Sequence, residues 1–142
     1  MSSGTIVSSE HLDEDIRELV REATIVRERA YAPYSNFKVG AALRGENGTI
    51  FKGCNVENSA YPAGVCAERA ALFQAVTEGQ KKFKAVVVVA SGNFTSPCGI
   101  CRQALAEFGD MLVYLVPANN PQQILKTSIK ELLPMAFSFN TI

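Results

Sequence analysis

Four residues in two short motifs combine metal-binding thiols with a carboxylate. Cys66 and Glu68 lie two positions apart in Cys-Ala-Glu, and Cys98 and Cys101 form a Cys-x-x-Cys motif that follows Pro97. Thiolates are good ligands for Zn²⁺, which takes four ligands, so three cysteines leave one position for water. Zinc lowers the pKa of such a water from about 16 toward roughly 7. The two motifs therefore predict one catalytic zinc site.

The carboxylate of the first motif suits a proton-transfer role. Glu68 follows the first expected ligand by two positions, in what should be the first turn of a helix. From there it can reach a metal-bound water without being a ligand itself. A positioned carboxylate that takes and returns protons typically contributes about 10² to 10⁴ in rate. We predict that Glu68 is the catalytic acid and base.

Three thiolates around one Zn²⁺ leave excess negative charge, which a neighbouring cation should compensate. Arg69 follows Glu68 directly, and Arg102 follows Cys101. We predict that one or both arginines, with Arg69 as the first candidate, donate hydrogen bonds to the ligand sulfurs. The alternative is that either is an ordinary surface arginine.

Two other residues offer competing interpretations of the metal site. Cys54 could complete a purely structural four-cysteine site, but that site would leave Glu68 with no water to activate. We expect Cys54 to be a small buried thiol at the end of a strand. His11 is the only histidine, and we expect it to be an ordinary residue of the first helix.

The pattern of apolar residues predicts the elements that must position these motifs. Helical spacing predicts helices over residues 10–31, 66–77, 98–108 and 128–133. Strand-like runs cover residues 37–43, 49–54, 85–90, 111–116 and 123–127. Asn47-Gly48 favours a hairpin between the first two strands. The uninterrupted run over residues 85–90 is typical of a strand at the centre of a sheet.

This order of elements predicts an α/β fold, a three-layer α/β/α sandwich with a mixed five-stranded sheet. Both cysteine motifs lie where a strand-to-helix loop becomes a helix, so they should meet at one edge of the sheet. A helix N-terminus also lowers the pKa of a thiol and prepares it for a cation. No repeat or linker divides the sequence, and we expect a single catalytic domain over residues 1–142.

Composition narrows the classes of partner. The chain has 14 basic and 14 acidic residues and no basic run, which argues against a polynucleotide partner. Its longest apolar run, residues 85–90, falls far short of the roughly 20 residues of a membrane helix. The first ten residues lack the pattern of a secretory signal. We therefore predict a cytoplasmic protein with reduced thiols.

From residue 31 to residue 137 the sequence resembles the small homotetrameric cytidine deaminases. The resemblance rests on Cys-Ala-Glu, on Pro-Cys-x-x-Cys and on the Cys-Asn-Val-Glu-Asn stretch that begins at Cys54. It implies a cytidine deaminase-like fold and one Zn²⁺ per chain, held by the three cysteines of the two metal motifs. It also implies hydrolytic deamination of cytidine and 2′-deoxycytidine to uridine and 2′-deoxyuridine, with release of ammonia, in pyrimidine salvage.

The resemblance also implies contacts to a nucleoside substrate. Asn55 and Glu57 would hydrogen-bond the ribose hydroxyls and part of the pyrimidine. Phe37 would form an aromatic wall against the base, although a strand-core role for this ring is the alternative. The backbone N–H of Ala67 and the backbone carbonyl of Ser96 would contact the base.

Two aromatic residues connect the resemblance to an oligomer. Tyr61, and Phe137 in the Leu-Leu-Pro-Met-Ala-Phe segment, match family positions that reach a neighbouring subunit's active site. The implied assembly is a homotetramer with shared sites.

Three other functions remain open on the sequence. A blasticidin-S deaminase shares the metal motifs, but Glu57 fits a reader of ribose. A deaminase that edits polynucleotides needs a basic groove, which the zero net charge disfavours. A non-catalytic zinc-stabilised interaction module would keep zinc without releasing ammonia.

Overall fold

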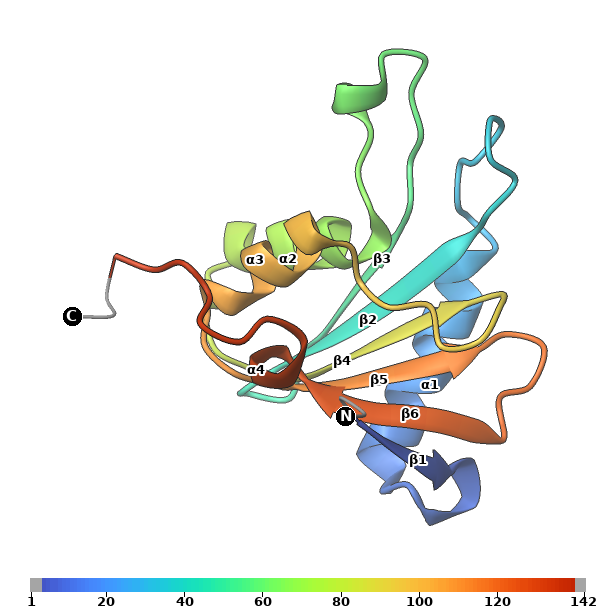
Figure 1. Cartoon of the computed structure of the whole chain (residues 1–142), viewed down its shortest axis with the longest axis vertical. Coiled ribbons are helices and arrows are strands. Elements are labelled where there is room, and N and C mark those ends of the chain that lie inside the picture. Colours follow the sequence, from blue (N-terminus) through green and yellow to red (C-terminus); the bar gives the residue numbers. More distant parts are fainter. Residues whose placement is uncertain (1–3, 140–142) are drawn as a thin grey trace.

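The computed structural model describes residues 4–139, which form one mixed sheet of six strands between two layers of helices (Figure 1). The strand order across the sheet is β1-β6-β5-β4-β2-β3. The strands are β1 Thr5–Ser8, β2 Val39–Gly45, β3 Ile50–Cys54, β4 Phe83–Ala90, β5 Leu112–Pro117 and β6 Gln123–Ser128. The helices are α1 Glu14–Arg27, α2 Ala67–Thr77, α3 Gly99–Ala106 and α4 Ile129–Leu132, with 3-10 turns η1 Ser9–His11 and η2 Tyr61–Ala63.

The central strand β4 is buried on both faces, as its run of valines predicts. Val87 packs in the core with Leu19 of α1, on one side of the sheet. Val88 packs on the other side with Leu72 of α2 and Leu105 of α3. Successive strand residues face opposite ways, so one strand serves both cores. Figure 1 shows the resulting layers, with α1 behind the sheet and α2 and α3 in front. The predicted three-layer sandwich is confirmed.

The predicted number of five strands is wrong, because β1 adds a sixth. It pairs antiparallel with β6, with Thr5 opposite Lys126 and Ser8 opposite Gln123. The run Thr5–Ser8 has only four residues, which is too short a pattern to predict a strand. Its hydrogen bonds depend on a partner more than a hundred residues along the chain, and sequence periodicity cannot report such a partner.

The first helix is shorter than the expected range of residues 10–31. Asp13 is the N-cap of α1, and His11 lies before it in η1, not in the helix. At the other end, the backbone of Tyr31 bonds to Asn55 and Glu57, which draws the chain away from the helix axis. None of the helices in residues 4–139 is long and apolar enough to cross a membrane.

Strand pairing brings two loops to the same edge of the sheet. Both β3 and β4 run antiparallel to β2, and Gly40 of β2 is opposite Cys54 on one side and Val89 on the other. The C-terminal ends of β3 and β4 are therefore aligned. The segments that leave these ends lead into α2 and α3, which begin with the two cysteine motifs.

Candidate metal centre and active site

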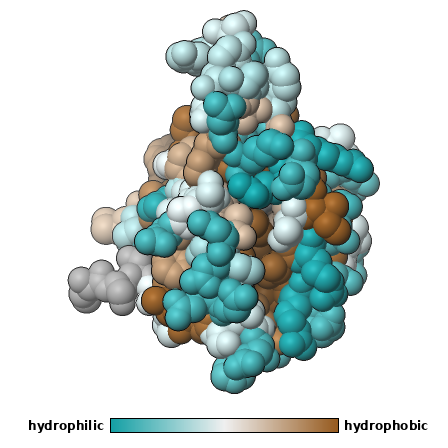
Figure 2. Space-filling model, turned by 90° about the vertical axis from the view of Figure 1, so that its right-hand side faces the viewer, coloured by the Kyte–Doolittle hydropathy of each residue, from teal (hydrophilic) through white to brown (hydrophobic). Residues whose placement is uncertain are grey.

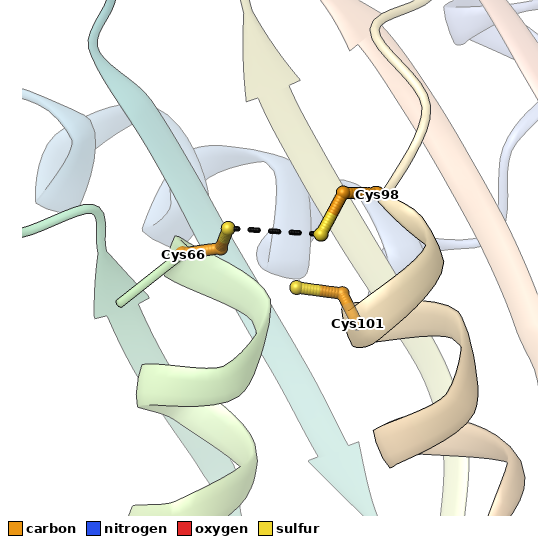
Figure 3. A group of neighbouring side chains, drawn as sticks. All are labelled: Cys66, Cys98 and Cys101. Atoms are coloured by element: carbon orange, nitrogen blue, oxygen red, sulfur yellow. Dashed lines mark hydrogen bonds between the residues drawn. The ribbon is translucent and has the colours of Figure 1, made fainter. Parts of the chain in front are cut away.

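Three thiols meet between the N-termini of α2 and α3. Cys66 is the N-cap of α2, Cys98 is the N-cap of α3, and Cys101 lies in the first turn of α3. Their Sγ atoms lie within 4.8 Å of one another, and 3.9 Å separates Cys66 from Cys98. Figure 3 shows the three side chains pointing toward a common centre. Cys54, at the end of β3, is not part of this group.

The donor set fits a zinc ion. With Zn–S bonds of about 2.3 Å, two sulfurs of a tetrahedral site lie about 3.8 Å apart, close to the separation of Cys66 and Cys98. Three thiols in this arrangement can hold one Zn²⁺ and leave a fourth position open. The four-cysteine alternative has no support in this geometry, because Cys54 stands apart.

Without metal, the thiols of Cys66 and Cys101 share protons unequally. A hydrogen bond from Cys101, with a smaller contribution from Arg69, lowers the pKa of the Cys66 thiol to about 5. The same hydrogen bond to Cys66, together with burial, raises the pKa of Cys101. One thiol is therefore ready as a thiolate while its neighbour retains its proton. A bound cation would replace that proton, since thiolates are the metal ligands.

A glycine sets how deeply α2 sits on the sheet. A Cβ atom at Gly53 of β3 would lie 2.4 Å from the carbonyl oxygen of Ala67 and 2.5 Å from the backbone nitrogen of Ala71. Only a residue without a side chain permits this contact between backbones. The close approach fixes the position of the first turn of α2. It therefore also fixes Cys66 and Glu68, the first and last residues of the Cys-Ala-Glu motif.

The carboxyl group of Glu68 is buried beside the thiols. The residue is 5% exposed, and burial raises the pKa of its carboxyl from 4.5 to about 7. The negative charge of Cys66 adds to this increase. A carboxyl with a pKa near 7 can both hold and release a proton under ordinary conditions, as proton transfer requires.

The two arginines of the motifs have different partners. Arg69 Nη2 lies 3.6 Å from Cys66 Sγ, and hydrogen bonds to Cys101 and Cys66 raise the pKa of its guanidinium. Arg102 instead donates to Pro97 O, Leu132 O and Ser96 Oγ. Arg69 therefore lies within hydrogen-bonding distance of a ligand sulfur, whereas the Arg102 hydrogen bonds go to oxygen atoms.

A cavity of about 520 Å³ opens next to Cys66. One wall comes from the segment after α1, and the other comes from the long segment between β3 and α2, which projects from the body (Figure 1, green). In Figure 2 this projection stands at the top, and its surface is mostly pale or hydrophilic. The lining residues are Tyr34, Ser35, Asn55, Val56, Glu57, Asn58, Tyr61, Gly64, Val65, Cys66 and Arg69.

Glu57 is held in this cavity by hydrogen bonds. Its Oε1 accepts from the backbone nitrogens of Tyr34 at 3.0 Å and Ser35 at 3.1 Å, and its Oε2 accepts from Ser35 Oγ. The hydroxyl of Ser35 is the main reason that the pKa of this carboxyl is lowered. Sequence reasoning missed Ser35 as a partner. Its position two residues before Phe37, where a hydroxyl can accept from a backbone N–H, was the available signal.

Asn55 ties the cavity to the start of β2. Its Oδ1 accepts from Val39 N at 2.9 Å, and its Nδ2 donates to Phe37 O at 2.8 Å. Ser35 Oγ accepts from Phe37 N. Both backbone groups of Phe37 are therefore held by side chains that line the cavity, while its ring is 37% exposed.

Four of the expected substrate contacts lie outside the set of described residues that line the cavity. Ala67 begins α2, where backbone N–H groups lack helical partners. Phe37 adjoins the cavity through Asn55. Ser96 bonds Arg102 through its hydroxyl. Phe137 is 67% exposed and packs edge to face against Phe139 at 5.2 Å.

Comparison with known proteins agrees with this geometry. The family model for the cytidine and deoxycytidylate deaminase zinc-binding region matches residues 13–116. A cytidine deaminase of Sporosarcina psychrophila is 53% identical over 127 residues, which cover 87% of this chain and 92% of that protein. A blasticidin-S deaminase of Bacillus cereus is 34% identical, over 87% of this chain and 92% of that protein.

A solved structure extends the agreement to the fold. The crystal structure of cytidine deaminase from Burkholderia pseudomallei matches with a TM-score of 0.80 and 45% identity, over 85% of this chain and 98% of that chain. The resemblance found in the sequence is confirmed. With three facing thiols, a buried carboxyl and a matching family model, the chain belongs to the cytidine and deoxycytidylate deaminase zinc-binding family.

Proposed function

We propose that this chain catalyses the hydrolytic deamination of cytidine and 2′-deoxycytidine, giving uridine and 2′-deoxyuridine with release of ammonia. The observation that carries the proposal is the placement of Glu68, a buried carboxyl with a pKa raised to about 7, beside three thiols that fit zinc. A purely structural zinc site has no need for such a carboxyl. The cavity next to Cys66 supplies space for a nucleoside.

The chain's own residues provide the proton transfers. Zn²⁺ bound by Cys66, Cys98 and Cys101 would supply an acidified water as the nucleophile. The Glu68 carboxylate takes a proton from the attacking water and gives it to ring nitrogen N3 as the oxygen adds to C4. The same carboxylate then takes the proton of the hydroxyl added at C4 and gives it to the amino group, which leaves as ammonia while the C4 carbonyl forms. Arg69 offsets thiolate charge through its contact with Cys66.

The sugar is bound by the groups of Glu57 and Asn55 that the fold leaves unused. A carboxylate has about four acceptor positions, and Glu57 uses two on Oε1 and one on Oε2. The fourth, on Oε2, accepts one ribose hydroxyl. Asn55 likewise retains one N–H and one acceptor position beyond its bonds to Phe37 and Val39. These two side chains therefore read a free sugar through one or two hydroxyls.

The base is held by one ring and two backbone groups. Phe37 packs against the flat face of the pyrimidine. The N–H of Ala67, at the open start of α2, donates to the base, and the carbonyl of Ser96 accepts from it. The support for these roles is the match of each residue to the family motif and its position around the cysteine cluster.

We propose that the working form is a homotetramer with shared sites. Tyr61 is 80% exposed at the tip of the projecting segment, and Phe137 is 67% exposed near the C-terminus. The support for this assembly is the match of both residues to family positions that reach a neighbouring subunit's active site, together with this exposure. Light scattering at micromolar concentration tests the assembly. A single catalytic domain over residues 1–142, a cytoplasmic location and a salvage role remain predictions.

One assay separates this function from its rivals. Purified protein with a measured zinc content is given cytidine, 2′-deoxycytidine, cytosine, CMP and blasticidin S, and ammonia release is followed. We expect about one Zn²⁺ per chain, turnover of the two nucleosides, and little turnover of CMP. Faster turnover of blasticidin S than of cytidine would make the chain a blasticidin-S deaminase. Zinc retention without ammonia release from any of these compounds would indicate a non-catalytic module.

A further inference from the structure

Arg102 joins two segments that are far apart in the sequence. Its Nε donates to Pro97 O at 2.8 Å and its Nη2 donates to Ser96 Oγ at 2.7 Å. Its Nη1 donates to Leu132 O at 2.8 Å, thirty residues along the chain. All three nitrogens of the guanidinium are therefore used. Nε and Nη2, on one edge of the planar guanidinium, bind the loop between β4 and α3, and Nη1 binds the end of α4.

The element on the far side of this link is itself anchored. Ile129, the first residue of α4, is 2% exposed in the core, and its backbone nitrogen donates to Met111 O at 3.0 Å. The next backbone nitrogen, of Lys130, donates to Asp110 Oδ1 at 2.9 Å. Because α4 is fixed at its start, Leu132 offers Arg102 a stable acceptor.

The loop on the near side leads directly to the metal centre. Residues 91–98 connect β4 to α3 and end at Cys98, the exposed member of the thiol cluster. Packing holds part of this loop, since Phe94 contacts the core and Pro97 is buried. Arg102 adds two hydrogen bonds directly before Cys98, to Ser96 Oγ and Pro97 O.

A neighbouring residue of α3 binds the segment that follows α4. Gln103 Nε2 donates to Phe137 O at 3.0 Å. Two consecutive residues of α3 thus hold the chain after residue 131, one at each end of a short stretch. Because Cys101 lies in the same helix, these bonds attach the helix that carries this ligand to the C-terminal segment.

We propose that Arg102 is a positioning residue, which clamps the Ser96–Cys98 loop to α4 and thereby holds Cys98 in the geometry of a ligand. The part that concerns Cys98 rests on the metal centre alone. A second part, that the clamp also aims the Ser96 carbonyl at the base, rests on the proposed function.

The shape of the guanidinium, more than its charge, carries this role. The three acceptors of Arg102 are two carbonyls and a hydroxyl, all of them neutral. A lysine would keep the positive charge near the thiolates, but a single ammonium cannot reproduce the planar fork that reaches both sides. Substitution by lysine therefore separates clamping from charge compensation.

The test compares Arg102→Lys and Arg102→Gln with the wild type. Arg17→Lys is the matched control, because Arg17 is exposed on α1 and pairs only with Glu14 among the described side chains. Zinc affinity is measured by chelator competition, and local opening by hydrogen exchange. We expect both Arg102 variants to lose about 10 to 100-fold in zinc affinity. Exchange should increase in residues 96–98 and 132–137 but not in α1.

A milder variant keeps the test valid if both Arg102 variants fail to fold. Ser96→Ala removes one of the three hydrogen bonds and retains the carbonyl. We expect it to raise KM for cytidine without changing the pH dependence of kcat. We also expect faster hydrogen exchange around Cys98 and a smaller loss of zinc affinity than in the Arg102 variants, and wild-type values for both would overturn the clamp. Where Arg102→Lys does fold, adding Ser96→Ala to it should have little further effect, since the bond to Ser96 is already lost.

Wild-type zinc affinity and local exchange in Arg102→Lys would overturn the clamp. A loss of zinc affinity in Arg102→Gln but not in Arg102→Lys would assign the effect to charge and would also overturn the clamp. If the wild type does not deaminate cytidine, the proposed function fails. The zinc and exchange measurements still decide the role of Arg102 toward Cys98.

Discussion

Two glutamates, Glu68 beside the thiol cluster and Glu57 in the adjoining cavity, are held in opposite ways. Glu68 is buried in the first turn of α2, and burial raises the pKa of its carboxyl to about 7. Glu57 is partly buried on a loop, where bonds from Ser35 and Tyr34 lower the pKa of its carboxyl. Desolvation favours the neutral form of a carboxyl, whereas hydrogen bonding favours the charged form. The fold thus lets the Glu68 carboxyl gain and lose a proton near pH 7, and keeps the Glu57 carboxyl in its charged form, which accepts hydrogen bonds.

The same contrast separates the two walls of the site. The metal side is positioned by core packing, through helices that sit closely on the sheet. The substrate side is positioned by side chains that bond backbone groups of exposed loops. The residues of the metal centre therefore lie on packed helices, and the residues expected to bind substrate lie on loops, which tolerate sequence change more readily.

The largest expected effect is on turnover when Glu68 is replaced. Glu68→Gln keeps the shape of the side chain but cannot take a proton. We expect kcat for cytidine to fall by about 10² to 10⁴, with zinc content and fold unchanged. Zinc analysis and circular dichroism accompany the kinetic assay. Ammonia release close to the wild-type rate would remove Glu68 from the mechanism.

Stability against pH tests the opposite pKa shifts of the two carboxyls. In metal-free protein, the raised pKa of Glu68 means that its contribution to stability is present below pH 4.5 and is lost as the pH rises through about 7. Between pH 4 and pH 8, the wild type should therefore lose about 3 kcal/mol relative to Glu68→Gln.

Glu57 should behave with the opposite sign in the same experiment. Its pKa is lowered, so its contribution is present above pH 4.5 and is lost as the pH falls further. Urea unfolding at several pH values measures both differences. If the difference in unfolding free energy between the wild type and Glu68→Gln does not vary with pH, the Glu68 carboxyl does not have a raised pKa.

The packing of the metal side is tested at Gly53. Gly53→Ala places a Cβ against the backbone of α2, which should cost about 1 to 3 kcal/mol of stability and weaken zinc binding. Gly99→Ala is the matched control, since a Cβ there meets no atom within 4 Å. It should be neutral or slightly stabilising in a helix. Equal melting temperatures for the two variants would show that α2 can shift without cost.

The smallest expected effect concerns the substrate side. Glu57→Gln removes the charge and one acceptor oxygen, so KM for cytidine should rise about tenfold, the equivalent of one hydrogen bond. We expect kcat to change much less. Glu78→Gln, at an exposed position after α2, serves as the control. A large fall in kcat with unchanged KM would place Glu57 in the chemical step instead.

The sequence predicted those features that local pattern encodes. The two cysteine motifs marked the starts of α2 and α3, and the valines of β4 marked the sheet centre, because spacing along the chain reports them. The partners of Glu57 and Arg102 were not predictable in this way. Ser35 and Leu132 lie 22 and 30 residues from those side chains, and most of the bonds involve backbone atoms that any residue offers.

The unexpected strand β1 has a consequence for how the protein behaves in concentrated solution. Without it, β6 would form the outer edge of the sheet, with unpaired backbone groups between Gln123 and Lys126. Open edges of this kind recruit strands from other molecules and promote aggregation. A chain shortened by its first eight residues should keep its chemistry yet precipitate more readily. The N-terminal strand thus replaces the six-residue edge of β6 with an edge of four residues, and a short edge strand limits such pairing.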